Sequence, residues 1–347
     1  MTSDAEEPMA HPTPGQGPRR PTITTVAKAA GVSIATVSRV MSGSSAVTPD
    51  LAARVHKVAE ELSYRPSSAA RGLVLGSLRN VGVILPDLAN AYFFDVVKQM
   101  HHGAHADGYR MLIADYSGDA GDEYATALDL LGQVDGLLLL SSRIPVAGLK
   151  ELARQSTPVV LVNRIELGVD LPMVAIDNFT PMMELCGHLA KLGHRRVVYV
   201  AGSELSWQNR ERWRGIEMAK VLGIEAVKVA SDGTIEGSYA AVEEALTHEP
   251  TALICFNDLA ALGAISKLRE LGVRVPEDIS VTGFDDIAIA RHIDPRLTTV
   301  VSPKTQLGER GWALMHAALQ HESGAPLPLL PADLVVRGST GPVTTSA

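Results

Sequence analysis

The sequence predicts an α + α/β protein: an N-terminal helix-turn-helix domain followed by two doubly wound lobes, each built on a parallel β-sheet. Two observations carry this prediction. Residues 22–62 contain three short stretches with apolar residues at helical spacing, which is enough to close a small core. From residue 81 onward, ten short apolar runs alternate with helical stretches, as in two successive series of βα units. The 347 residues are long enough for both parts.

Two short helices joined by a tight turn at Gly31 are predicted between Thr22 and Met41. Thr22 and Ser33 each precede one helix, where a hydroxyl can accept a hydrogen bond from an unpaired backbone N–H. With Val37 and Val40 turned inward, the second helix presents a small, polar outer face that suits the major groove of DNA. That face consists of Ser33, Ile34, Ala35, Thr36, Ser38 and Arg39.

An ordinary pair of amphipathic helices would share this pattern, and a third helix favours the DNA-binding interpretation. Thr48 and Pro49 supply a cap and a first-turn proline for that helix. Its apolar face comprises Leu51, Val55, Val58, Ala59 and Leu62. Three helices can enclose a small core.

The charge is unevenly distributed along the chain. The net charge of −8 argues against a nucleic-acid-binding protein when the chain is taken whole. Residues 19–80, however, hold nine basic and three acidic side chains, whereas residues 81–347 hold 22 basic and 33 acidic ones. The basic charge of residues 19–80 beside the acidic charge of residues 81–347 favours contact with DNA phosphates through residues 19–80.

Two stretches, AKAAGVSIATVSRVMSG and VTPDLAARVHKVAEELSYRPSSAARGL, carry a resemblance to a known family. Almost without gaps from Thr22 to Leu73, the chain resembles the DNA-binding headpiece of the lac repressor (LacI/GalR) family of transcription regulators. The resemblance extends to about residue 338 and implies that the two lobes form an effector-binding and dimerisation domain of periplasmic-binding-protein type. It also implies a repressor that binds a pseudo-palindromic double-stranded DNA operator as a homodimer. A tetramer is the alternative, although no heptad-bearing tail follows Val336.

The resemblance implies a short hinge helix after the headpiece, which orders when two copies meet in the minor groove. Leu73 matches the residue that wedges between base steps in the family, and Ala70 and Arg71 lie beside it. The alternative is that Leu73 only anchors the next domain. The expected segments are a disordered leader (1–20), the headpiece (21–66), the hinge helix and linker (67–79), the two-lobed domain (80–338) and a tail (339–347).

The ten apolar runs are expected to form the strands of the two lobes. Lobe 1 is expected to span about 80–177 plus 303–331, and lobe 2 about 178–301 plus 332–338, with a helix from Pro303 to Gln320 returning to lobe 1. The expected strands are 81–85, 109–114, 136–140, 158–162 and 173–176 in lobe 1, then 196–202, 226–230, 252–256, 279–284 and 297–301. A cleft is expected at the carboxyl ends of these strands.

Ligand-binding side chains are expected on the loops that follow the strands. Asn90, Tyr92 and Phe93 follow the first apolar run, and Asn178 follows the fifth. The family resemblance implies three more ligand residues, in the motifs RWRG, CFND and GFDD: Arg212, Asn257 and Asp285.

Arginine, asparagine and aspartate from different strands can pair with vicinal hydroxyl groups, so the expected effector is a small polar metabolite, namely a sugar. One feature departs from the family: the loop 231–234 lacks the aromatic residue that some members place against a ligand ring. Trp207 or Tyr92 is the candidate substitute. Asp258 and Asp286 are expected to cap the helices that follow them.

Catalysis, cofactors and metals are not predicted. The sequence has no Ser/His/Asp arrangement, phosphate-binding glycine loop or nucleotide fingerprint. Among His101, His102 and His105, positions 101 and 105 share a helix face. No third ligand of clear spacing accompanies this pair, which favours a surface or dimer-contact role over a metal site. Cys186 and Cys255 are expected to be reduced, buried thiols.

The absence of an apolar N-terminal run and of a membrane-spanning stretch predicts a cytoplasmic protein with no membrane partner. Two alternatives remain at this point. One is a solute-binding receptor without a regulatory DNA role, and the other is an enzyme built on the doubly wound scaffold.

Overall fold

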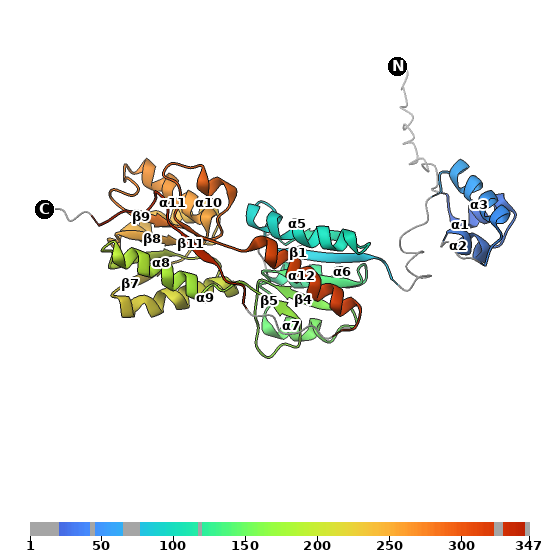
Figure 1. Cartoon of the computed structure of the whole chain (residues 1–347), viewed down its shortest axis with the longest axis horizontal. Helices are drawn as coiled ribbons and strands as arrows, with labels where there is room; N and C mark the ends of the chain where they lie inside the picture. Colours follow the sequence, from blue (N-terminus) through green and yellow to red (C-terminus); the bar gives the residue numbers. More distant parts are fainter. Residues whose placement is uncertain (1–20, 42–45, 65–76, 117–119, 323–328, 344–347) are drawn as a thin grey trace, which may run out of the picture. The chain divides into compact units, whose positions relative to one another are not determined.

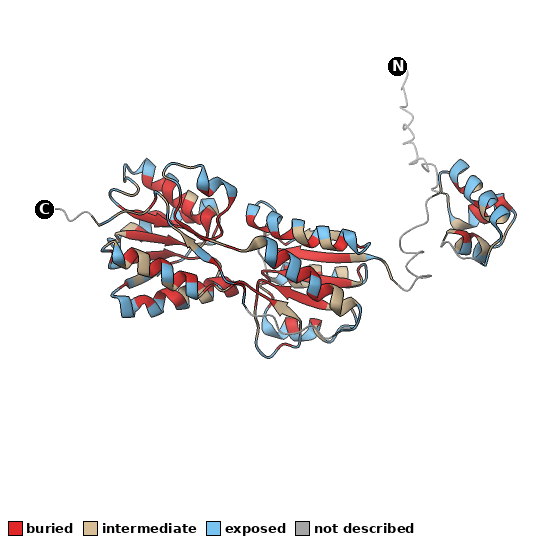
Figure 2. Cartoon of the chain, in the orientation of Figure 1, coloured by how far each residue is buried: buried red, intermediate tan, exposed pale blue. Residues whose placement is uncertain are grey.

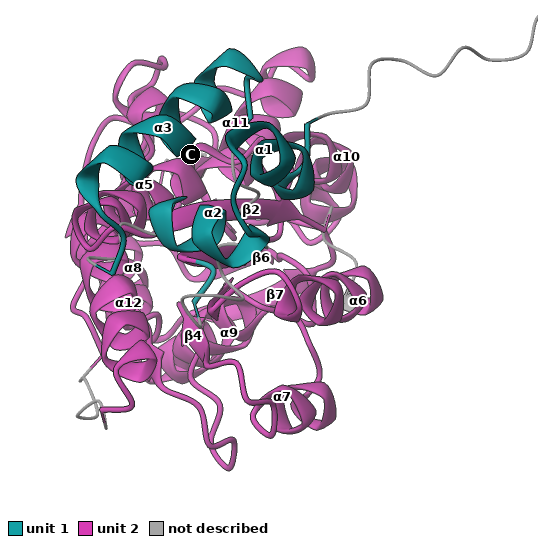
Figure 3. Ribbon diagram, turned by 90° about the vertical axis from the view of Figure 1, so that its right-hand side faces the viewer, with its two compact units in different colours: residues 1–78 teal, residues 79–347 magenta. Residues whose placement is uncertain are grey.

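The computed structural model describes residues 21–41, 46–64, 77–116, 120–322 and 329–343. The chain divides into two compact units, residues 1–78 and 79–347, which are described separately (Figure 3). The predicted leader and the predicted hinge residues Ala70, Arg71 and Leu73 lie outside the described residues.

The first unit contains three helices around a small apolar core: α1 (Ile23–Ala30), α2 (Ile34–Met41) and α3 (Pro49–Glu61). Val26, Val37 and Val55, one from each helix, are fully buried.

Side-chain caps fix the starts of the first two helices in this unit. The Thr22 hydroxyl accepts a hydrogen bond from the Thr25 amide, and the Ser33 hydroxyl accepts one from the Thr36 amide at 3.1 Å. Thr48 precedes α3 as expected, but its side chain makes no capping hydrogen bond, so that part of the prediction is wrong. Pro49 still presets the backbone of the first turn.

The first lobe of the second unit is a five-stranded parallel sheet with the order β2-β1-β3-β4-β5. Helices α5 (Ala91–Ala106) and α12 (Lys304–Leu319) pack on one face, and α6 (Ala120–Leu131) and α7 (Val146–Leu152) on the other (Figure 1). The strands are β1 (Asn80–Leu85), β2 (Arg110–Asp115), β3 (Gly136–Leu140), β4 (Val159–Val162) and β5 (Met173–Val174).

The second lobe is a four-stranded parallel sheet with the order β7-β6-β8-β9. Its strands are β6 (Arg196–Val200), β7 (Glu225–Val229), β8 (Ala252–Cys255) and β9 (Ser280–Thr282). Figure 1 shows one pair of helices on each face of this sheet. One pair is α8 (Thr180–Lys191) and α9 (Trp207–Met218, followed by a 3-10 turn, Ala219–Leu222), and the other is α10 (Ile235–Leu246) and α11 (Asp258–Glu270).

The tenth predicted strand differs from the expectation in its pairing. β10 (Thr299–Val301) pairs antiparallel with β11 (Asp333–Val335), and only isolated bridges join its neighbourhood to lobe 2. The physical reason is that this segment leaves the second sheet to reach α12, which packs on α5 in the first lobe.

Burial is concentrated in the strands and on the inward sides of the helices (Figure 2). Strand β3 is buried along its whole length because helices cover both faces of its sheet, which explains its continuous leucine run. The predicted fold class, a helix-turn-helix domain and two parallel-sheet lobes, is confirmed.

Candidate functional site

The outward face of α2 is the first candidate site. Ser33, Ala35 and Arg39 are exposed, and Ile34 retains 48% of its accessible surface. Thr36 and Ser38 are half-buried, and the Ser33 and Thr36 hydroxyls lie 2.9 Å apart. All six residues predicted from the sequence therefore lie away from the core that Val37 and Val40 enter.

The second candidate site is a cavity of about 560 Å³ between the two lobes, at the carboxyl ends of the strands. Six of the seven predicted ligand residues line it: Asn90, Tyr92, Phe93, Arg212, Asn257 and Asp285.

Asn178, the seventh predicted residue, is buried and is not among the residues that line the cavity. Its Oδ1 accepts a hydrogen bond from Arg212 Nε at 2.8 Å, and its Nδ2 donates to the Ile176 carbonyl at 2.9 Å. Asn178 thus orients the arginine that faces the cavity.

The Arg212 guanidinium is held on several sides. It lies 3.6 Å from the centre of the Phe284 ring, and its Nη1 donates to the Phe256 carbonyl. Its Nη2 lies 3.6 Å from Asp285 Oδ1, and Arg212 as a whole is 4% exposed. A guanidinium fixed in this way presents its remaining donor capacity in one direction.

Gly215 explains the Arg-x-x-Gly spacing. A Cβ at this position would lie 2.9 Å from the Phe179 carbonyl oxygen and 3.1 Å from Met182 Cβ. Glycine therefore allows α9 to approach the start of α8, and this approach brings Arg212 within reach of Asn178.

Asp285 is both strained and buried. Its φ is 113°, and Asp286 follows with φ 48°, both in the region that favours glycine. Ser302 Oγ donates to Asp285 Oδ1 at 3.2 Å. Burial raises the pKa of Asp285 to about 6, against the opposing effects of the Arg212 and Lys304 charges.

The prediction that Asp258 and Asp286 cap the helices that follow them is wrong. The N-cap of α11 is Asn257, one residue before Asp258, and the N-cap of the 3-10 turn after Asp286 is Ile287. Asn257 Oδ1 accepts the hydrogen bond from the Ala260 amide at 2.7 Å. Asp258 accepts instead from the Ile287 amide and the Thr299 hydroxyl, and Asp286 pairs with Arg291 and Arg337. Burial and the nearby Asp285 raise the pKa of Asp258 to about 8.

Ser141, Asn163 and Gln208 are among the cavity residues that the sequence did not predict. Gln208 of lobe 2 donates through Nε2 to Ser141 Oγ at 3.0 Å and to the Asn163 carbonyl of lobe 1. Asn163 Nδ2 in turn donates to the Tyr92 hydroxyl and to Ser141 Oγ, both at 3.0 Å. These hydrogen bonds join the two lobes across the cavity.

Asn163 also carries an unmet acceptor. Its Oδ1 is buried and has no hydrogen-bond partner within the described part of the chain. Its φ is 63°, and Ser141 has φ 51°, so both strand ends hold residues in the left-handed region. A buried acceptor without a donor costs free energy.

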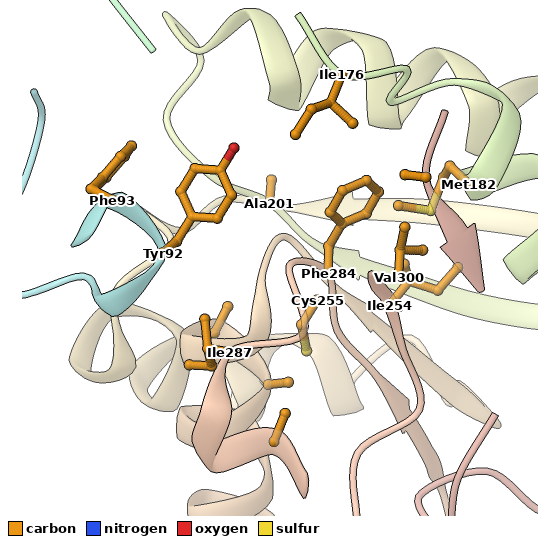
Figure 4. Close-up of a cluster of buried hydrophobic side chains, with 14 of the residues drawn as sticks. Tyr92, Phe93, Ile176, Met182, Ala201, Ile254, Cys255, Phe284, Ile287 and Val300 are labelled. Carbon is orange, nitrogen blue, oxygen red and sulfur yellow. The ribbon is translucent and has the colours of Figure 1, made fainter. Parts of the chain in front are cut away.

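Tyr92 places lobe 1 against the core of lobe 2. Figure 4 shows its ring in one buried cluster with Phe284, Ala201 and Ile176. Burial, reinforced by the Asp285 charge, raises the pKa of its hydroxyl well above the usual value. The Tyr92 hydroxyl therefore remains neutral and available for hydrogen bonding.

The remaining predicted features do not form a second chemical site. In the described ranges, no three His, Cys, Asp or Glu side chains are arranged to hold a metal ion. The rings of His101 and His105 stack on an exposed part of α5, with centroids 6.1 Å apart. Cys186 and Cys255 are free and buried, and burial raises the pKa of Cys186 to about 12. No described helix is long and apolar enough to cross a membrane.

A helix-turn-helix unit in one chain with a two-lobed α/β domain that encloses a polar cavity defines a ligand-responsive DNA-binding regulator. Residues 22–67 match the family model described as bacterial regulatory proteins, lacI family. Residues 186–340 match a periplasmic binding protein-like domain.

The HTH-type transcriptional repressor CytR of Escherichia coli (strain K12) is 34% identical over 328 residues, which cover 92% of this chain and 96% of CytR. The chain therefore belongs to the LacI family of bacterial transcription regulators, which confirms the resemblance.

Two solved structures extend this comparison. The transcriptional regulator CelR in complex with cellobiose is 30% identical, with a TM-score of 0.68 and coverage of 92% of this chain and 100% of that one. The lac repressor dimer bound to operator and the anti-inducer ONPF is 26% identical, with a TM-score of 0.78 and coverage of 93% and 100%. The chain is thus a DNA-binding transcription regulator with an effector-binding domain, as predicted.

Proposed function

We propose that this regulator is a homodimeric repressor whose effector is an uncharged sugar or closely related polyol bound between the lobes. The convergence of Arg212, Asn257, Asp285 and Asn163 on one cavity carries this proposal. Paired donors and acceptors suit vicinal hydroxyl groups. The lining holds four aspartates but two arginines, which disfavours an anionic ligand. The related CelR was solved with cellobiose.

For DNA recognition, the outer face of α2 divides into two roles. Ile34 and Ala35 are apolar and suit thymine methyl groups, whereas Arg39 suits the acceptors of guanine. Ser33, Thr36 and Ser38 position the helix on phosphates. Ala70, Arg71 and Leu73, which lie outside the described residues, would act in the minor groove.

The proposal includes no catalytic step, cofactor or metal ion. A repressor acts where its operator DNA lies, so we assign it to the cytoplasm. Two copies would contact two half-sites of a pseudo-palindrome through the symmetry of the dimer.

The test is selection and sequencing of genomic fragments bound by the full-length protein at moderate salt, where non-specific affinity fades. Enrichment of one short palindrome is expected. Thermal unfolding with a panel of neutral sugars, sugar phosphates and sugar acids would follow, and neutral sugars should raise the melting temperature. A solute-binding receptor would give a melting shift without any enriched DNA site.

Replacing Arg39 by alanine should weaken binding to the selected site by about 1–3 kcal/mol and relax the preference at one base pair. The reason is that the guanidinium reads guanine rather than phosphate. Binding measured on the selected site and on single-base variants tests this. Equal losses on all DNA sequences would show that Arg39 is only a phosphate contact.

Replacing Asn163 by leucine should weaken binding of the sugar identified by the melting screen by about 1–3 kcal/mol, because the variant removes the polar amide of Asn163. Calorimetric titration measures this loss. Asn80→Leu is the matched control, since Asn80 lies at the opposite end of β1 and donates to the Gln133 carbonyl. Equal affinity in the Asn163 variant and the wild type would remove Asn163 from the ligand site.

A further inference from the structure

Glu123 is a buried carboxylate close to the wall of the cavity. It lies in the first turn of α6, one helical turn before Ala127, and both residues are fully buried. A carboxylate at such a core-facing position costs free energy unless hydrogen bonds replace its contacts with water. Glu123 Oε2 accepts a hydrogen bond from the Arg143 amide at 2.7 Å, in the loop that follows β3. The carboxylate is therefore bound to the backbone of that loop.

Arg164, which follows β4, contacts the same loop. This residue is 3% exposed, and its Nη1 donates to the carbonyls of Ser142 at 3.1 Å and of Ile144 at 2.7 Å. Its Nε and Nη2 donate to Glu166 Oε2, which fixes the orientation of the guanidinium. Two buried charged side chains thus bind backbone groups of three successive residues. We call Glu123 and Arg164 the loop clamp.

The clamped loop carries Ser141 and Arg143, which both line the cavity. Ser141 has φ 51°, a backbone conformation that is costly for a residue with a side chain and persists only where the surrounding structure holds it. Ser141 Oγ accepts hydrogen bonds from Gln208 Nε2 and from Asn163 Nδ2, both at 3.0 Å. Its hydroxyl hydrogen is then the group that Ser141 can donate to an effector oxygen.

We propose that Glu123 and Arg164 are positioning residues for effector binding, although neither is among the residues that line the cavity. The loop clamp holds the Ser141 hydroxyl and Arg143 at the cavity wall before the effector binds, which reduces the conformational entropy lost on binding. The inference rests on the proposed function, because it requires a sugar bound between the lobes.

Titration of the full-length protein with a neutral sugar tests the loop clamp. The probe is the sugar with the largest melting shift in the screen, whose panel includes ribose, glucose and cellobiose. Glu123→Leu fills the buried space but removes the acceptor of the Arg143 amide. It should raise the Kd of the sugar about tenfold, which corresponds to the loss of roughly one hydrogen bond to the effector. Glu123→Gln keeps an acceptor and should stay within about twofold of the wild type.

A second clamp variant tests the contacts of Arg164. Arg164→Lys keeps a positive charge beside Glu166 but loses the planar fork, and a single ammonium group does not reproduce its geometry. The Kd of the sugar should rise in this variant as well. Arg164→Lys carries the test if circular dichroism shows that Glu123→Leu does not fold.

Leu152→Ala is the control that separates positioning from a general loss of stability. Leu152 of α7 is buried in the same apolar cluster as Ala127 and Ile144, and its side chain has no polar atom. The substitution should lower the midpoint of urea unfolding. The Kd of the sugar should nevertheless stay within about twofold of the wild type, at a temperature where all variants are folded.

The outcomes distinguish the loop clamp from the proposed function. A sugar that binds Glu123→Leu and the wild type equally would overturn the clamp alone. An equal loss of affinity in Leu152→Ala, or a loss in Glu123→Gln as large as in Glu123→Leu, would also overturn it. No melting shift with any neutral sugar would overturn the proposed effector class together with the clamp.

Discussion

Replacing Arg212 by methionine is expected to lower the free energy of unfolding by about 3–5 kcal/mol at pH 8, because a buried carboxylate then loses its cation. Arg212 and Asp285 are 4% and 6% exposed, so water screens their interaction poorly. The variant also removes the hydrogen bonds to Asn178 and to the Phe256 carbonyl. Urea unfolding at two pH values measures the loss.

The loss of unfolding free energy caused by Arg212→Met should be smaller at pH 5.5 than at pH 8. Folding raises the pKa of Asp285 from the usual 3.8 to about 6, so its contribution to stability is full below about pH 4 and is lost as the pH rises through about 6. Because Arg212 lowers this pKa, its removal raises the pKa further and enlarges the penalty for ionisation at pH 8. A loss that does not vary between the two pH values would contradict the assigned role of the Asp285 charge.

The double variant Arg212→Met with Asp285→Asn separates stability from ligand binding. Removing both charges should recover much of the stability, since no uncompensated buried charge remains. Effector binding should be lost in both the single and the double variant, because Arg212 and Asp285 are two of the groups proposed to pair with the effector hydroxyls. Recovery of effector binding along with stability would show that Arg212 and Asp285 serve only the fold.

The central strands β3, β4 and β8 were predictable because they are buried along their whole length and therefore form unbroken apolar runs. The leucines of β3, 137 to 140, are the clearest example. The pairing of β10 was not predictable, because an apolar run gives no indication of whether its partner precedes it in the sheet or lies at β11, more than thirty residues later. The local sequence pattern therefore predicts that β10 is a strand, whereas the crossover between the lobes determines that it pairs with β11.

Asn90, Tyr92 and Phe93 followed from the rule that ligand residues lie after strands, and Arg212, Asn257 and Asp285 from the family resemblance. The same rule applies to Ser141 and Asn163, which directly follow β3 and β4. Small polar residues at these positions are common in ordinary loops, so their positive φ and the unpartnered Asn163 Oδ1 became visible only in the structure.

The contacts of Asn178 and Asp258 were not predicted, for a geometric reason. Asp258 lies between the cavity-lining residues Asn257 and Leu259, but its carboxylate accepts from the Thr299 hydroxyl and not from the helix amides. Asn178 and its neighbours in the sequence are not among the residues that line the cavity, and its Oδ1 accepts from Arg212 Nε. Sequence spacing of one residue does not resolve these directions.

Replacing Gly308 by alanine is expected to lower the free energy of unfolding by about 3 kcal/mol, toward the upper end of overpacking effects. The added Cβ would overlap the Val96 carbonyl oxygen and lie 2.8 Å from Gln99 Cβ. A backbone oxygen within α5 cannot rotate away as a side chain can, so the two helices must separate. Chemical denaturation of the full-length protein measures the loss.

Gly132→Ala is the matched control, because no atom lies within 4 Å of a Cβ built at that exposed position. It should be neutral or stabilising by up to about 1 kcal/mol, through the reduced entropy of the unfolded chain. A Gly308 variant as stable as the Gly132 variant would show that α5 and α12 separate at little cost, and would contradict the assigned role of Gly308 in their close approach.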